Sequence, residues 1–307
     1  MGFVEQHEVA RVANDVISLL GEHYVDPDAA AAISRTMAAS LAGGRYSADE
    51  QTLATAVTED LQSVNGDKHL RLLYHAEPLP ERTPGDDSAE YAAMAQWAGQ
   101  TSWGMARVEH LPGNVGYLDI QPVLFPSTIS GDAIAAAMSL VAGTEALLID
   151  VRHCLGGEPS AVALVCSYLH GPEPVELTGL YERKGNRVRQ SWTTPFVPGR
   201  RFGADKPVYV LTSQTSFSGA EELAYDLQQL KRATIVGERT RGGAHAREGF
   251  RVHPHLEATI SVARAVNPVT GTNWEGTGVT PDVAVPADQA RDWAHRHATG
   301  RLAVASA

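Results

Sequence analysis

Apolar residues recur at helical spacing through the first part of the chain. One apolar stripe covers residues 9–20 and another covers residues 53–61. Between them, Asp26 and Pro27 form a helix start, because aspartate caps a helix and proline suits its first turn. The pattern predicts three helices between residues 6 and about 64, packed as a small bundle.

The pattern changes at Gly113, where short apolar runs alternate with helical segments. The apolar runs are "NVGYLDI", "ALLIDVR", "VYVLTS" and "ATIVGE". Helices are expected near residues 131–142, near residues 158–169 and after Ser218, and a long ribbon of alternating residues follows. Such alternation predicts an α/β layer with mostly buried strands.

These patterns suggest an organisation in three parts. Residues 1–75 are expected to form the helical bundle and lead into the first strand. Residues 76–112 are rich in proline, glycine and aspartate at first and weakly patterned later, which is typical of a linker. Residues 113–307 are expected to form the main α/β core.

Composition narrows the class of protein. The chain has 307 residues, of which 43% are hydrophobic and 20% charged, and its net charge is -11. This balance is typical of an acidic soluble protein and argues against a nucleic-acid partner, because phosphate binding needs a concentrated basic surface. The N-terminus lacks the features of a signal peptide, and no apolar run is long enough to span a bilayer. We therefore expect a cytoplasmic protein without a membrane partner, with a removed secretory signal as the alternative.

Cysteine and histidine spacing argues against a metal or cofactor. The two cysteines, Cys154 and Cys166, are too few for a disulfide framework and are expected to be free thiols. The histidines show no HExxH or comparable ligand spacing. We expect neither a metal nor another cofactor.

Ser218 stands where an apolar strand gives way to a helix. With Glu221 it forms the S-x-x-E pattern of a capping box, which explains the serine without any chemistry. The same position also suits a nucleophile, since the free amides and the dipole of a helix N-terminus favour developing negative charge. Taken alone, this stretch favours the cap.

Other candidate residues are equally ordinary when taken one at a time. The pair Gly156-Gly157 follows a buried strand and exposes amides that a ligand could meet, although a plain turn explains it as well. His69 begins an early strand, and Glu275 lies in a late loop. A lone histidine or glutamate is more often surface or satisfied structure than catalytic machinery.

Together, four stretches resemble a known family. They are "DKHLRLLY", "DVRHCLGG", "TSFSGAEELAYDLQQLKRATIVGERTRGGAH" and "NPVTGTNWEGTGVTPDV". In this order they resemble the tail-specific (C-terminal processing) serine proteases, and within them the branch similar to tricorn and to interphotoreceptor retinoid-binding protein. The resemblance covers nearly the whole chain. It implies an α/β fold with a crotonase-like ββα core behind a small N-terminal helical bundle, and it implies that Ser218 is the nucleophile.

The resemblance also assigns the partners of Ser218. Many family members use a lysine one strand further on, but the matching position here is Gly243, which excludes that dyad. The tricorn-like branch uses histidine and glutamate, and the matching residues are His69 as general base and Glu275 as its orienting carboxylate. That branch has a serine immediately before the histidine, where this chain has Lys68.

The remaining candidate residues lie in or beside the same motifs. The amide of Gly219, with that of Gly156 or Gly157, is expected to hold the oxyanion. Substrate contacts are assigned to three further residues: Asn273, His245 and Cys154. His245 could replace the missing lysine as a base, whereas a solvent-facing histidine at a strand end is its simpler interpretation.

The functional prediction is a serine hydrolase that cleaves peptide or other acyl bonds. The chain has no room for a PDZ module between His75 and Gly113, so a short peptide or small acyl substrate is expected. Two alternatives stay open: a non-catalytic protein that binds apolar, retinoid-like ligands, and a biosynthetic enzyme that cyclises its acyl-enzyme. Oligomerisation also stays open.

Overall fold

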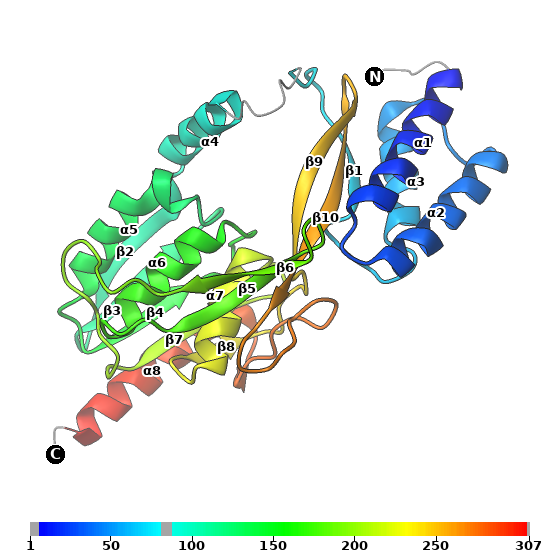
Figure 1. The fold of residues 1–307 in the computed structure, drawn as a ribbon. Coiled ribbons are helices and arrows are strands. Elements are labelled where there is room, and N and C mark those ends of the chain that lie inside the picture. The colour runs from blue at the N-terminus through cyan, green and yellow to red at the C-terminus, as the bar shows by residue number, and fades with distance from the viewer. Residues whose placement is uncertain (1–5, 81–87, 306–307) are drawn as a thin grey trace. The chain divides into compact units, whose positions relative to one another are not determined.

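The structure, a computed structural model, describes residues 6–80 and 88–305 and divides into two compact units (Figure 1). The first unit is formed by residues 6–80, Leu180–Arg189 and His245–Ala265. The second unit is formed by residues 88–179, 190–244 and 266–305. Because the chain passes between the units several times, neither is a simple N- or C-terminal domain.

The helical part of the first unit confirms the predicted N-terminal helices. They are α1 (Gln6–His23), α2 (Pro27–Ala42) and α3 (Glu50–Leu61). Asp26 caps α2 by accepting hydrogen bonds from the amides of Asp28 and Ala29, and Pro27 occupies the first turn. The apolar stripes meet in one core that includes Val16, Ile33 and Val57.

An antiparallel sheet completes the first unit. Its strands are β1 (Arg71–Tyr74), β9 (His245–His253), β10 (Leu256–Val266) and parts of β5 (Glu176–Glu182) and β6 (Arg187–Trp192). The strand order is β1-β10-β5-β6, with β9 also paired to β10. Arg71 lies opposite Thr259, which places the loop before β1 beside the middle of β10.

The second unit is built on a mostly parallel sheet with the order β11-β8-β7-β4-β3-β2. Its strands are β2 (Met105–Leu111), β3 (Val115–Ile120), β4 (Ala146–Asp150), β7 (Val208–Thr212), β8 (Thr234–Gly237) and β11 (Val283–Ala284). Only β2 runs antiparallel among these strands. Every residue of β4 and β7 is buried, which explains their continuous apolar runs.

Helices cover both faces of this sheet. Small residues of α8 (Ala287–Ala305) pack on one face against Leu148 and Leu211. The other face carries α5 (Ser127–Val141), α6 (Pro159–Leu169) and α7 (Gly219–Gln229), as Figure 1 shows. The predicted α/β core is therefore confirmed. In the described part of the chain, every helix is too short or too polar to cross a bilayer.

The structure differs from the expected organisation at two places. The expected linker, residues 76–112, contains α4 (Ser88–Gln100), a short 3₁₀ helix (Ser102–Gly104) and β2, while residues 81–87 lie outside the described residues. The β9–β10 ribbon, expected in the core of residues 113–307, belongs to the first unit, because β10 pairs with β1.

The parallel strands bring three loops to one edge of the second unit. Strands β4, β7 and β8 run in the same direction, so the loops that follow Asp150, Thr212 and Gly237 leave the sheet at the same end. In open α/β sheets this carboxyl end is the usual place for a ligand site.

Candidate active site

Ser218 lies at the strained junction between β7 and α7. Its backbone has φ 51° and ψ -118°, a conformation that glycine adopts readily and other residues rarely. Holding a serine there costs about 1 to 3 kcal/mol, and such strain is typical of functional positions. A serine on a sharp strand-to-helix turn is also the arrangement that exposes the nucleophile in α/β-hydrolases.

Glu221 holds this conformation in place. The amide of Ser218 donates to Oε2 of Glu221 at 2.9 Å, which is the well-formed half of the predicted capping box. The same carboxylate accepts the amides of Gly242 at 2.6 Å and Gly243 at 2.9 Å, and the hydroxyl of Thr240 at 2.5 Å. Burial raises the pKa of Glu221 to about 7, although the four hydrogen bonds act in the opposite direction. Glu221 therefore joins the Ser218 turn to the loop that carries Gly243, the position of the expected lysine.

Ser216, two residues before Ser218, has a structural role. Its hydroxyl donates to the carbonyl of Val151 at 2.8 Å and accepts the amide of Ser213 at 3.0 Å. The side chain is fully buried. These contacts tie the Ser218 turn to the loop after β4.

The glycine loop lies against Ser218. A Cβ added to Gly156 would lie 3.1 Å from Cβ of Ser218 and 3.6 Å from its Oγ, and one added to Gly219 would lie 2.6 Å from the carbonyl oxygen of Gly157. Leu124 fixes the loop by donating its amide to the carbonyl of Gly156 at 2.9 Å. The amide of Gly156 interacts with the thiol of Cys154, whereas no backbone acceptor is found among the described residues for the amides of Gly157 and Gly219. Two N–H groups, those of Gly157 and Gly219, are thus candidates for the donors that an oxyanion hole needs.

Cys154 supports this loop and does not line it. Its side chain is fully buried, and its thiol donates to the carbonyl of Gly156 at 3.3 Å. Burial raises the pKa of the thiol to about 12, so a thiolate is absent at neutral pH. This corrects the expected substrate contact of Cys154 and gives the residue a structural role.

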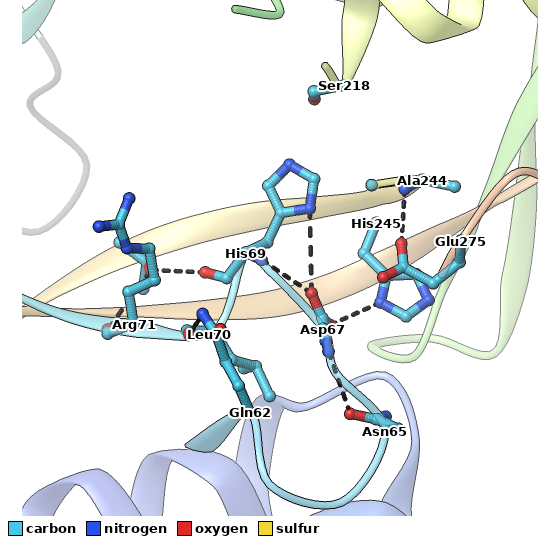
Figure 2. A network of polar contacts seen from close by, with 12 residues as sticks. Gln62, Asn65, Asp67, His69, Leu70, Arg71, Ser218, Ala244, His245 and Glu275 are labelled. Atoms are coloured by element: carbon cyan, nitrogen blue, oxygen red, sulfur yellow. Dashed lines mark hydrogen bonds and ion pairs between the residues drawn. The ribbon is translucent and has the colours of Figure 1, made fainter. Parts of the chain in front are cut away.

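Glu275 and Asn273 stabilise the segment that contains Gly243 and Ala244. Oε2 of Glu275 accepts the amide of Ala244 at 2.5 Å, and Oδ1 of Asn273 accepts the amide of Glu275 at 2.9 Å. Figure 2 shows the first of these bonds. Between them, the indole of Trp274 donates to the carbonyl of Gly243 at 2.9 Å. In the second unit, Glu275 and Asn273 therefore hold the segment around the empty lysine position.

In the first unit, Asp67 connects the two candidate histidines (Figure 2). Nδ1 of His245 lies 2.6 Å from Oδ2 of Asp67, a short charge-assisted distance. Oδ1 accepts the amide of His69 at 2.9 Å and lies 3.9 Å from Nδ1 of the same histidine. The side chain of His245 is only 10% exposed, so its interpretation as a solvent-facing histidine is wrong.

The surroundings of Asp67 keep it charged despite its burial. Burial raises its pKa, but the hydrogen bond and charge of His245, together with the amide and charge of His69, lower it to about 2. The hydroxyl of Tyr24 also donates to Oδ2 at 3.1 Å. Asp67 is thus an anchored anion between two imidazoles.

The candidate residues divide between the two units. Those of the second unit are Ser218, Gly219, Gly156, Gly157, Cys154, Asn273 and Glu275, and those of the first are His69 and His245. Sequence reasoning missed Asp67, although "GDKHL" places it two residues before His69. It recognised Glu221 only as a helix cap. The position of Asp67 near His69 in the sequence could have suggested its role. The role of Glu221 became visible only in the fold, since Glu221 contacts residues about 20 positions away.

Comparisons with sequence families agree with this organisation. The model described as peptidase family S41 matches residues 114–285, more than half of the chain. A second model, described as the N-terminal domain of Peptidase_S41 in eukaryotic IRBP, matches residues 6–101. The two matches together include all of the candidate residues.

A curated relative is the carboxy-terminal-processing protease of Bartonella bacilliformis. It is 28% identical over 186 residues, which cover 56% of this chain and 39% of the relative. The chain therefore spans about two fifths of the length of the relative that it matches.

Solved structures share the fold at low sequence identity. A lipoprotein from Streptococcus agalactiae aligns with TM-score 0.61 and 15% identity over 95% of this chain and 96% of its own. The photosystem II D1 C-terminal processing protease aligns with TM-score 0.54 and 16% identity over 92% of this chain and 94% of its own. The tricorn protease aligns with TM-score 0.63 and 13% identity over 97% of this chain and 37% of its own.

Proposed function

Because the chain belongs to peptidase family S41, we propose that it is a serine hydrolase that cleaves peptide or other acyl bonds through an acyl-enzyme on Ser218. The observation that carries the proposal is the strained backbone of Ser218, tied to Glu221 and placed beside the glycine loop. A cap alone needs no positive φ, since an N-cap residue ordinarily has an extended backbone. The strain is explained if the hydroxyl must point at a substrate.

The reaction needs a base, a nucleophile and an oxyanion site. The base takes the proton from Oγ of Ser218 as this oxygen attacks the carbonyl carbon, and later returns a proton to the leaving group. Negative charge then develops on the carbonyl oxygen. The amides of Gly219 and of Gly156 or Gly157 would bind it, and each such donor is typically worth about 3 to 4 kcal/mol of transition-state stabilisation.

His69 is proposed as the general base. The family's lysine is absent at Gly243, and an imidazole is the side chain that exchanges protons most readily near neutral pH. Glu275 remains the carboxylate proposed to orient His69, on the strength of the family resemblance. This assignment requires the imidazole of His69 to reach the hydroxyl of Ser218 during the reaction.

The proposed substrate is a short peptide or a small acyl compound. Residues 88–111, where a PDZ module could have been inserted, instead form α4, the 3₁₀ helix and β2. Selection of the substrate would then depend on the residues around Ser218 or on a partner.

The test is covalent labelling of the full chain by a fluorophosphonate, followed by intact mass and peptide mapping. We expect a single adduct on Ser218 that disappears in Ser218→Ala and is strongly reduced in His69→Gln. The matched control is Ser139→Ala, which removes an exposed hydroxyl inside α5 and should keep the adduct. An adduct that persists in Ser218→Ala would overturn the assignment. Absence of labelling in the folded wild-type protein would favour the apolar-ligand binder, and the mass of the released product would distinguish hydrolysis from cyclisation.

A further inference from the structure

We propose that Asp67 is a positioning residue shared by two histidines: it holds His245 as its charged partner and thereby leaves His69 neutral and available as a base. The inference rests on the proposed function for the role of His69. It adds two residues, Asp67 and His245, to the machinery that would prepare this base. Every contact used below lies within the first unit.

The two contacts of Asp67 differ in kind. Nδ1 of His245 lies at hydrogen-bond distance, 2.6 Å, whereas Nδ1 of His69 lies at 3.9 Å, beyond a hydrogen bond but within reach of the charge. Since a charged carboxylate only accepts, His245 must carry a proton on Nδ1. The carboxylate therefore stabilises the positive charge that a second proton, added at Nε2, would give the ring of His245.

Burial disfavours a second imidazolium at His69. The residue is 5% exposed, so a charge on its ring would lose most of its hydration. An imidazolium on His245 would repel it as well, because like charges that are close together disfavour each other. The pair therefore takes up its first proton at His245 and its second only at lower pH.

The backbone and the surrounding side chains fix this arrangement. Oδ1 of Asp67 accepts the amide of His69, while the hydroxyl of Thr259 on β10 donates to the carbonyl of His69 at 2.6 Å. The ring of Tyr24 stands edge-on to that of His245, with centroids 6.5 Å apart. Within the first unit, the titratable groups that contact Asp67 are His69 from its own loop, Tyr24 near the end of α1 and His245 from β9.

The experiment is an NMR titration of the histidine ring protons in the full-length protein. Comparison with His69→Gln and His245→Gln assigns the two signals among the 12 histidines. In wild type we expect His245 to titrate at higher pH than His69. In His245→Gln the midpoint of His69 should rise by about 1 pH unit, because the repelling cation is gone. In Asp67→Asn both midpoints should fall by about 1 unit or more, because the anion is gone.

The matched control is Glu257→Gln in the same unit. Oε2 of Glu257 lies 3.0 Å from Nε2 of His75, a separate imidazole–carboxylate pair. This change should shift the signal of His75 and leave those of His69 and His245 in place.

Two results would overturn the inference. One is a His69 midpoint that does not move in His245→Gln, which shows that the histidines are independent. The other is wild-type titration of His69 above His245. If Asp67→Asn does not fold, the His245→Gln comparison decides alone. The titration does not require turnover. If the fluorophosphonate fails to label Ser218, the proposed function is wrong, but the titration result still stands.

Discussion

Asp67 in the first unit and Glu221 in the second are both fully buried carboxylates that hold a candidate catalytic residue, yet their pKa values move in opposite directions. That of Asp67 falls to about 2 and that of Glu221 rises to about 7. Each accepts several hydrogen bonds, so the number of donors does not explain the difference.

The charge of the donors explains it. Two of the groups around Asp67 are imidazoles that can carry positive charge, whereas Glu221 accepts only from amides and a hydroxyl. Neutral donors do not fully replace the hydration that a buried carboxylate loses, while a cation can. The first unit therefore holds a permanent anion, and the second holds a carboxyl group that can take up a proton near neutral pH.

The largest expected effect tests whether the two units act on one reaction. Ser218→Ala should lower turnover by about 10⁴-fold or more, and His69→Gln should also be severe. In the double variant the losses should not multiply, since residues that act as a unit fail together. Steady-state rates on a peptide or ester substrate provide the measurement. Multiplying losses would show that His69 acts apart from Ser218.

The next effect concerns the stability cost of Glu221. Because its pKa is higher in the folded state than its ordinary value of 4.5, its contribution to stability is complete below about pH 4.5 and is lost as pH rises through about 7. The loss amounts to about 3 kcal/mol. Urea unfolding between pH 4.5 and 8 should show this decline in wild type and not in Glu221→Gln. The exposed Glu173 offers the control, since Glu173→Gln should keep the wild-type slope.

Asp67 should give the opposite slope in a different pH range. Its folded pKa of about 2 lies below the ordinary 3.8, so its contribution is present above about pH 4 and is lost as pH falls through about 2. The contribution is about 2 kcal/mol. Unfolding measured between pH 2 and 5 should show the loss in wild type and not in Asp67→Asn. Asp132→Asn, at an exposed site, should behave like wild type; an equal slope in all three proteins would contradict the comparison.

The smallest effect isolates the strain at Ser218. Ser218→Gly and Ser218→Ala both lack the hydroxyl, but only glycine accepts φ 51° without strain. We expect the glycine variant to be more stable by about 1 kcal/mol in chemical unfolding. At Ser139, inside α5, the same pair should differ in the opposite direction by about 1 kcal/mol, because glycine weakens a helix. Equal signs at the two sites would remove the argument from strain.

Local patterns were enough for much of the fold. The apolar stripes predicted the N-terminal helices, and the continuous runs predicted the buried strands β4 and β7. Local patterns did not predict the structure of residues 76–112, because α4 is mostly exposed and has no apolar stripe. The β9–β10 ribbon was recognised as a strand pair, but its partner β1 lies about 180 residues away, and only folding decides such a pairing.

For the candidate site, the sequence by itself determined which residue types are present: a serine after a strand, a glycine pair, a histidine in an early loop and no lysine at position 243. These residue types can be read directly from short sequence motifs. Only the tertiary structure decided that Ser218 is strained, that Cys154 is buried, that Glu221 reaches the loop around Gly243 and that Asp67 joins His69 to His245. Burial and hydrogen bonding between distant segments set these properties, and neither is a function of spacing along the chain.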